Sequence, residues 1–259
     1  MTRPGGATPP GWRMFGIPVY LAPSWFIIAG LVTWSLARGY YPAIYPELHP
    51  TVYWLMGLVS SVLLFACVLL HELGHSVVAR QHGVPVACVT LFLLGGVAQI
   101  VREAPRPSAE MKIALAGPLV SAGLALVLLP LAEAIPITSV PQLAFAGVLR
   151  YLGIANLVLL IFNMLPGFPL DGGRLLRAAL WGATGDFRRS TRIAARVGSG
   201  IGLALLVLGV ATMVTTWSLR GIWYVLLGWF VRNAALASAR SVAYLDQGKR
   251  SSRVPSGKW

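Results

Sequence analysis

Four long stretches without a charged side chain limit most strongly what this chain can fold into. They are Met14–Ala37, Ile113–Ala132, Tyr151–Leu170 and Val197–Leu219. A helix needs about 20 predominantly apolar residues to cross a lipid bilayer. Only 11% of the residues are charged, whereas soluble domains carry roughly a quarter. The sequence therefore predicts a membrane protein that is embedded in the bilayer.

Six apolar segments are predicted to cross the membrane as helices, and two of them include charged residues. The predicted spans are Pro18–Leu36, Tyr53–Arg80, Ile113–Leu131, Leu143–Leu165, Val197–Thr216 and Ile222–Ala239. We therefore expect an all-α polytopic membrane protein with three parts. These are a cytoplasmic N-terminal segment (1–17), a domain of six transmembrane helices (18–240) and a flexible cytoplasmic C-terminal tail (241–259).

The net charge of +13 is better explained by membrane topology than by nucleic-acid binding. Lys and Arg lie between the apolar stretches, without a basic stripe or a recognised reader motif, so no nucleic-acid partner is expected. If the N-terminus is cytoplasmic and the six spans alternate, 18 of the 21 Lys and Arg residues lie inside, and only Arg38, Arg150 and Arg220 lie outside. The positive-inside rule then predicts a cytoplasmic-membrane protein with both termini in the cytoplasm.

The segment between the second and third predicted spans is unusually apolar for a cytoplasmic loop. Its stretch Val84–Val101 is rich in β-branched residues and centres on Gly95 and Gly96. This composition favours a membrane-associated β-hairpin over a helix. An ordinary interfacial loop is the alternative.

The strongest functional signal is the run His71-Glu72-Leu73-Gly74-His75, inside the second predicted span. Residues i and i+4 share one face of a helix, so His71 and His75 can present their imidazoles to a single zinc ion. Glu72 lies beside them and can act as general base toward a water that the metal activates. Ionisable residues inside a membrane helix are costly and usually functional. A buried Glu–His cluster that locks helices together is the structural alternative.

A catalytic zinc ion usually takes three protein ligands, and Asp171 is the candidate for the third. It follows the fourth predicted span, at the end where antiparallel alternation reaches the depth of His75. Pro166 and Pro169 break the helix before it, and Gly172-Gly173 after it allow close backbone approach. From its position alone, Asp171 is equally suited to cap a following helix.

These motifs resemble those of the site-2 proteases, a family of intramembrane zinc metalloproteases. The resemblance covers nearly the whole chain, from about Gly16 to Ala239. It rests on three motifs, each on a membrane segment: His71-Glu72-Leu73-Gly74-His75, Ala116-Gly117-Pro118, and Asn163 with Pro166, Pro169, Leu170, Asp171, Gly172 and Gly173. The six-span count is similar to that of the compact prokaryotic branch.

The resemblance implies a role for each matching residue. His71, His75 and Asp171 would bind one zinc ion (Zn²⁺) per chain. Glu72 would be the catalytic acid and base, and Asn163 would hold the substrate or the developing oxyanion.

The sequence thus predicts an enzyme, a zinc metalloendopeptidase that cuts membrane-protein substrates in or near their transmembrane segments (regulated intramembrane proteolysis). An unwound substrate could add as a strand to the hairpin, where Gly95 and Gly96 would let two chains approach closely. A membrane zinc transporter or metal sensor is the alternative, although it needs more polar residues within the membrane. A catalytically inactive scaffold is another. The branch that this chain resembles often carries nucleotide-binding regulatory domains after the sixth span. The sequence ends at Trp259 before any such domain, so either the protein lacks them or the sequence is part of a longer protein.

Overall fold

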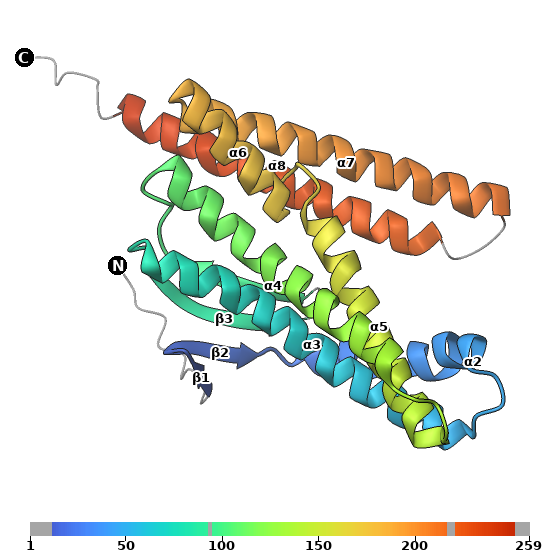
Figure 1. Cartoon of the computed structure of the whole chain (residues 1–259). Helices are drawn as coiled ribbons and strands as arrows, with labels where there is room; N and C mark the ends of the chain where they lie inside the picture. The colour runs from blue at the N-terminus through green and yellow to red at the C-terminus, as the bar shows by residue number, and fades with distance from the viewer. Residues whose placement is uncertain (1–11, 93–94, 217–220, 252–259) are drawn as a thin grey trace, which may run out of the picture. The chain divides into compact units, whose positions relative to one another are not determined.

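The computed structural model describes residues 12–92, 95–216 and 221–251 (Figure 1). Its elements are β1 (Trp12–Met14), β2 (Ile17–Leu21), α1 (Ser24–Ser35), the π-helical segment η1 (Leu36–Tyr40), α2 (Tyr41–Ile44), α3 (Pro50–Gln81), β3 (Val86–Phe92), β4 (Gly95–Ile100), α4 (Pro107–Ala134), α5 (Val140–Asn163), α6 (Asp171–Thr184), α7 (Phe187–Thr216) and α8 (Gly221–Ser251). The outer parts of the two expected terminal segments (1–11 and 252–259) and the expected hairpin turn (93–94) lie outside the described residues.

The chain divides into two compact units. Unit 1 comprises Met1–Pro105 and Leu115–Ile161, and unit 2 comprises Arg106–Ala114 and Phe162–Trp259. Unit 1 therefore contains the four strands, α1 to α3 and most of α4 and α5. Unit 2 contains the first turns of α4, the last residues of α5, and α6 to α8.

Five helices in the described part of the chain are long and apolar enough to cross a membrane. They are Pro50–Gln81, Pro107–Ala134, Val140–Asn163, Phe187–Thr215 and Gly221–Arg240. Each overlaps one of the last five predicted spans, so the chain is a multi-pass, mostly helical membrane protein. Helix α8 continues to Ser251, which makes the first part of the expected C-terminal tail helical.

The predicted first span is wrong at its start. Ile17–Leu21 forms strand β2, and helix α1 begins only at Ser24. Pro18 and Pro23 disfavour a helix across this stretch, because proline lacks the N–H that a helix interior needs. The helical run then continues through η1 and α2 to Ile44, beyond the predicted end.

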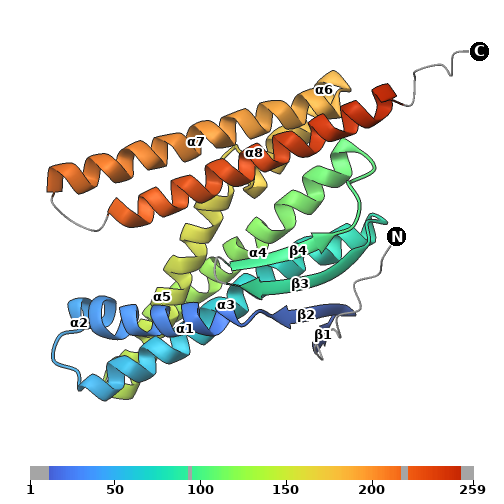
Figure 2. The same cartoon turned by 180° about the vertical axis from the view of Figure 1, so that it is seen from behind.

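The four strands form one sheet in the order β1-β2-β3-β4 (Figure 2). β1 pairs with β2 and β3 with β4 in antiparallel fashion, whereas β2 and β3 are parallel. A parallel pair needs a long crossover, which α1, α2 and α3 provide. The sequence pattern predicts strands only in the segment of β3 and β4, and it does not indicate β1 and β2. Strand β4 lies at the edge of the sheet and contacts α3.

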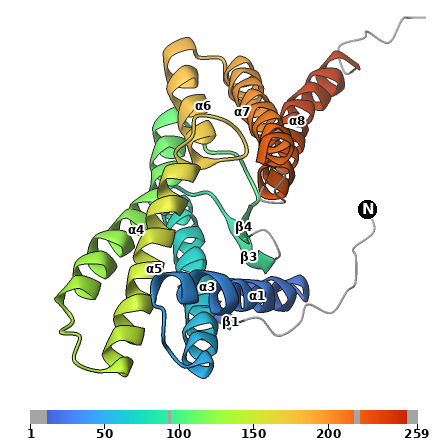
Figure 3. The ribbon, with the colours of Figure 1, turned by 90° about the vertical axis from the view of Figure 1, so that its right-hand side faces the viewer.

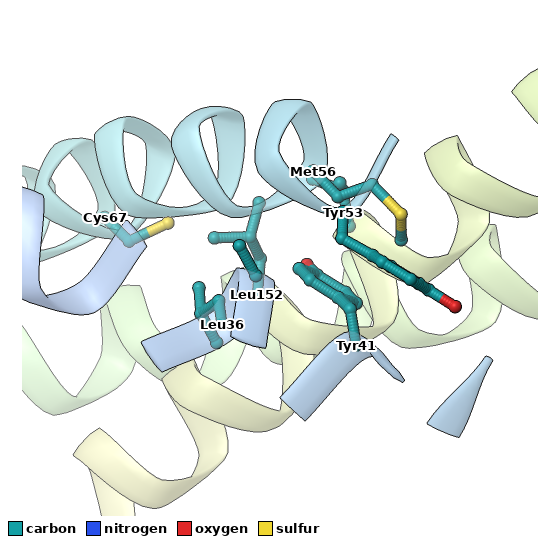
Figure 4. Packing of buried hydrophobic residues seen from close by; sticks show 8 residues of the cluster. Leu36, Tyr41, Tyr53, Met56, Cys67 and Leu152 are labelled. Carbon is teal, nitrogen blue, oxygen red and sulfur yellow. The ribbon is translucent and has the colours of Figure 1, made fainter. Parts of the chain in front are cut away.

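The core of unit 1 lies where α3, α5 and the run from α1 to α2 meet (Figure 4). Its buried residues are Leu36, Ala37, Tyr41, Tyr53, Met56, Cys67, Val148 and Leu152. Tyr41 is fully buried, and its hydroxyl lies 2.5 Å from the hydroxyl of Ser60 on α3. This packing fixes the position of α3, the helix that carries the His-Glu-x-x-His motif.

In unit 2, α7 and α8 lie side by side as an antiparallel pair (Figure 3). Glycines allow their backbones to approach closely. A Cβ added at Gly202 would lie 2.7 Å from the backbone nitrogen of Arg232, and one added at Gly209 would lie 2.7 Å from that of Val225. Small residues at helix contacts are typical of membrane proteins, where close van der Waals packing drives helix association.

Candidate metal centre

His71 and His75 lie one turn apart on the same face of α3, as the sequence predicts. Both side chains are buried, with 3% and 4% of their surface exposed. Their Nε2 atoms lie 3.3 Å apart, and the rings meet edge to face with centroids 4.9 Å apart. The two imidazoles therefore direct the same ring nitrogen toward one point.

The spacing of these two nitrogens fits a single zinc ion. Two nitrogens that each bind one tetrahedral zinc at 2.0–2.1 Å are about 3.3–3.4 Å apart. The observed separation of 3.3 Å matches this value without any change of rotamer. The two nitrogens are thus spaced as two ligands of one zinc ion would be.

Helix α4 passes close to the histidines, because two glycines remove the side chains that would keep the helices apart. A Cβ added at Gly74 would lie 3.0 Å from the carbonyl oxygen of Ala116. A Cβ added at Gly117 would lie 2.7 Å from His71 Nε2 and still closer to His75 Nε2. Gly117 therefore leaves open the space that a shared metal ion needs.

Replacing Gly117 by Ala is expected to weaken zinc binding, because the new methyl group would lie within 2.7 Å of the Nε2 atoms of both histidines, where the ion would bind. The measurement is zinc affinity of the purified chain in detergent, by competition with a chromophoric chelator. Gly123→Ala on the same helix is the matched control, since a Cβ there meets nothing within 4 Å. Wild-type affinity in Gly117→Ala would contradict the placement of the metal.

Glu72 lies beside the histidine pair and is held by strand β4. The backbone N–H of Ala98 donates a hydrogen bond to Glu72 Oε2 over 3.2 Å. Gly96 lies on the same stretch of strand, and a Cβ added there would lie 2.7 Å from Glu72 Cγ. Gly96 thus allows β4 to approach the carboxylate closely. Gly95 has a positive φ of 126°, a conformation that favours glycine.

Two contacts of the histidines come from α4 and were missed by the sequence analysis. Ser121 is fully buried, and its Oγ lies 2.9 Å from His71 Nδ1. The backbone nitrogen of Gly117 lies 3.4 Å from His75 Nδ1. The available signal was Ser121 itself, the single hydroxyl residue in the apolar stretch Ile113–Ala132.

In unit 2, Asp171 is the first residue of α6, and the N-cap position is occupied by Leu170. Asp171 is therefore not the N-cap of this helix, although a carboxylate in the first turn is favoured by the helix dipole. Its side chain is buried, with 8% of its surface exposed.

The turn that carries Asp171 is packed backbone against backbone. A Cβ added at Gly172 would clash with the carbonyl oxygens of Met164 and Leu165, and one added at Gly198 on α7 would lie 2.7 Å from the nitrogen of Phe168. Glycines in this turn thus permit the close backbone approach that the sequence predicts. This packing defines the position of the first turn of α6.

A buried charge cluster anchors α6 within unit 2. Arg177 donates hydrogen bonds to the carboxylate of Glu110, which is fully buried in the first turns of α4. The guanidinium also lies over the rings of Phe168 and Phe187, 5.1 and 4.6 Å from their centroids. These contacts join α6 to the preceding loop, to α4 and to α7.

Among the described residues, His71, His75 and Asp171 form a group that could hold a metal ion. Each of the three side chains is buried and offers one ligand atom. Two imidazole nitrogens and a carboxylate oxygen are a donor set that suits zinc. Asn163 is the last residue of α5 and is half-buried.

Comparison with known proteins points to one family. Residues 59–137 and 131–208 match the family model of Peptidase family M50, and these stretches contain all three residues of the candidate metal group. The chain is similar to the solved structure of the site-2 protease from Methanocaldococcus jannaschii. The TM-score is 0.60 at 30% sequence identity, covering 88% of this chain and 93% of the other.

Curated relatives extend this similarity. The chain is 42% identical over 234 residues to a protein of Synechocystis sp. whose name assigns it provisionally to the zinc metalloproteases, covering 90% of this chain and 60% of that protein. It is 37% identical over 202 residues to a zinc metalloprotease of Methanocaldococcus jannaschii, covering 78% of this chain and 54% of that protein. The chain thus spans little more than half the length of these curated relatives.

Proposed function

Because the chain belongs to peptidase family M50, the site-2 protease family, we propose that it is an intramembrane zinc metalloprotease. It would hydrolyse peptide bonds in or near the transmembrane segments of membrane-protein substrates. The observation that carries this proposal is the pair of buried histidines on a membrane helix, with Nε2 atoms 3.3 Å apart and Glu72 beside them. His71, His75 and Asp171 would hold one zinc ion per chain.

The chemistry is shared between the metal and three groups of the chain. A bound zinc ion supplies a Lewis acid that polarises the peptide carbonyl and activates a water near neutral pH. Glu72 takes the proton of the attacking water and delivers it to the leaving amine. The N–H of Ala98, 3.2 Å from Glu72 Oε2, orients this carboxylate. Asn163 would donate to the developing oxyanion.

The placement in the membrane follows from helix lengths and charge. The segments α1, η1 and α2 comprise 12, 5 and 4 residues in one continuous helical run, which reaches the length of about 20 residues that a span requires. We assign this run as the first of six spans. With 18 of the 21 Lys and Arg residues then inside, both termini would lie in the cytoplasm.

The substrate is expected to bind as an added strand. A helical substrate satisfies its own backbone hydrogen bonds, so it must unwind before its carbonyl groups are exposed to attack. Strand β4 is an edge of the sheet and lies beside Glu72, which supports addition of the unwound segment here. Gly95 and Gly96 would then form part of the substrate-binding strand.

Replacing Gly96 by Val is expected to reduce cleavage by about 100-fold, the scale of a 1 Å misplacement of a catalytic group, while zinc content stays unchanged. The reason is that a side chain here meets Glu72 Cγ at 2.7 Å and Val68 Cγ1 at 3.4 Å. Val97→Ala, on the exposed face of the same strand, is the control and should cleave normally. Loss of zinc from the Gly96→Val variant would contradict the role of Gly96 in the substrate-binding strand.

The proposed activity is tested by comparing membrane-protein fragments from cells that express the wild-type chain or Glu72→Gln. We expect transmembrane fragments that disappear with the wild-type chain to accumulate with Glu72→Gln. An identical fragment pattern in the two cell types, together with altered zinc uptake, would instead support transport. Zinc uptake is therefore measured on the same cells.

A further inference from the structure

Ser121 contacts the ring nitrogen of His71 that does not face His75. A neutral imidazole carries one proton, on Nδ1 or on Nε2. Only the nitrogen without the proton has a lone pair for a metal ion. Ser121 Oγ lies 2.9 Å from Nδ1, and both side chains are buried, at 0% and 3% exposure. A proton on Nδ1 therefore has an acceptor at ordinary hydrogen-bond distance.

The other tautomer would close the site. His75 Nε2 lies 3.3 Å from His71 Nε2, so a proton on Nε2 of His71 could be donated directly to His75. This internal hydrogen bond would occupy the point where the two lone pairs otherwise meet a metal ion. With the His71 proton on Nδ1 instead, its Nε2 keeps a lone pair for a metal ion.

Helix α4 provides an acceptor for a proton on Nδ1 of His71. Water is excluded from the buried Nδ1 of His71, so a proton there needs a protein acceptor. Ser121 supplies it from the same face of α4 as Gly117, one turn away. When a metal ion takes the lone pair of Nε2, the ring proton of His71 lies on Nδ1, where Ser121 Oγ is within hydrogen-bond distance as an acceptor.

We propose that Ser121 is a positioning residue that accepts the Nδ1 proton of His71 when its Nε2 binds zinc, and so stabilises the zinc-bound form. This inference rests on the proposed zinc centre. It assigns Ser121 a role in metal affinity and not in the proton transfers of cleavage. Partners of this kind, hydrogen-bonded to the far nitrogen of a histidine ligand, typically change metal affinity by about 10–100-fold when removed.

The test is zinc affinity of the full chain in detergent, measured by competition with a chromophoric chelator after the metal has been stripped. Ser121→Ala is expected to bind zinc about 10–100-fold more weakly than the wild type. Ser61→Ala is the matched control. Ser61 is also fully buried and also makes one hydrogen bond, to the carbonyl oxygen of Ala29 over 3.0 Å, away from the histidines.

Thermal unfolding of the zinc-free proteins separates positioning from general packing. Both serine variants are expected to lose a similar amount of stability, since each loses one buried hydrogen bond, whereas only Ser121→Ala should lose zinc affinity. Wild-type affinity in Ser121→Ala, or an equal loss in Ser61→Ala, would overturn the role of Ser121. If the wild-type chain binds no zinc, the proposed metal centre itself is wrong. That result differs from one in which the wild type binds zinc and Ser121→Ala binds it equally well, which refutes only the role of Ser121.

Discussion

Replacing Glu72 by Gln is expected to reduce cleavage of a transmembrane reporter by about 10²–10⁴-fold, the range that a positioned general acid–base group contributes. Zinc content should stay at the wild-type level, because Glu72 is not among the three residues of the metal group. Glutamine has the same shape, and its amide oxygen can still accept the hydrogen bond from the N–H of Ala98. The loss of cleavage would therefore result from the missing proton transfer and not from displacement of strand β4.

The control for this variant is Glu133→Gln, which changes the same chemical group far along the chain. Glu133 is exposed and forms a surface ion pair with Arg150 at 2.6 Å. Replacing its carboxylate by an amide should therefore leave cleavage unchanged. Both proteins are assayed as purified chains in detergent, with cleavage and bound zinc measured on the same sample. Normal cleavage by Glu72→Gln would exclude Glu72 as the catalytic base, and loss of zinc would show that it helps to bind the metal.

Replacing Arg177 by Met is expected to lower the free energy of unfolding by about 3–5 kcal/mol, the cost of removing one partner of a buried ion pair. The Glu110 carboxylate has no exposed surface, and after the change its nearest cation among the ion pairs described is Arg174, at 3.9 Å. The contacts of the guanidinium with the rings of Phe168 and Phe187 are lost as well. Denaturation of the purified chain by SDS or heat measures the change.

The double variant Glu110→Leu with Arg177→Met should recover most of this loss, because well-packed apolar residues can replace a buried ion pair without leaving an uncompensated charge. Arg150→Met is the matched control at an exposed pair, where side-chain exposures are 43% and 66%. It should change stability by less than about 1 kcal/mol. A small effect of Arg177→Met, or no recovery in the double variant, would contradict the assignment of Glu110 and Arg177 as a buried pair.

Helical periodicity in the sequence predicts the parts of the site that lie on one element. The i, i+4 spacing places His71 and His75 on one face of α3, and the structure has them there. The prolines and glycines around Asp171 indicate a broken helix with close backbone packing, and the loop before α6 is built in this way. The sequence position of Asp171 suits a helix cap as well as a metal ligand, and in the structure Leu170 occupies the N-cap position.

Contacts between distant elements were less predictable. Strand β2 pairs in parallel with β3, so that Val19 lies opposite Val89. A short apolar segment such as Ile17–Leu21 is compatible with a strand or a membrane helix until its partner is known. For the same reason the sequence does not indicate that Ser121 contacts His71, since this requires the rotation of α4 against α3.

We propose that His71, His75 and Asp171 bind one zinc ion. Zinc-edge X-ray absorption of the purified wild-type chain tests it most directly, because the spectrum reports the atoms bound to the metal. We expect nitrogen and oxygen neighbours at about 2.0–2.2 Å, with outer-shell scattering from two imidazole rings and no sulfur at about 2.3 Å. A spectrum with sulfur ligands, or without imidazole scattering, would contradict the account.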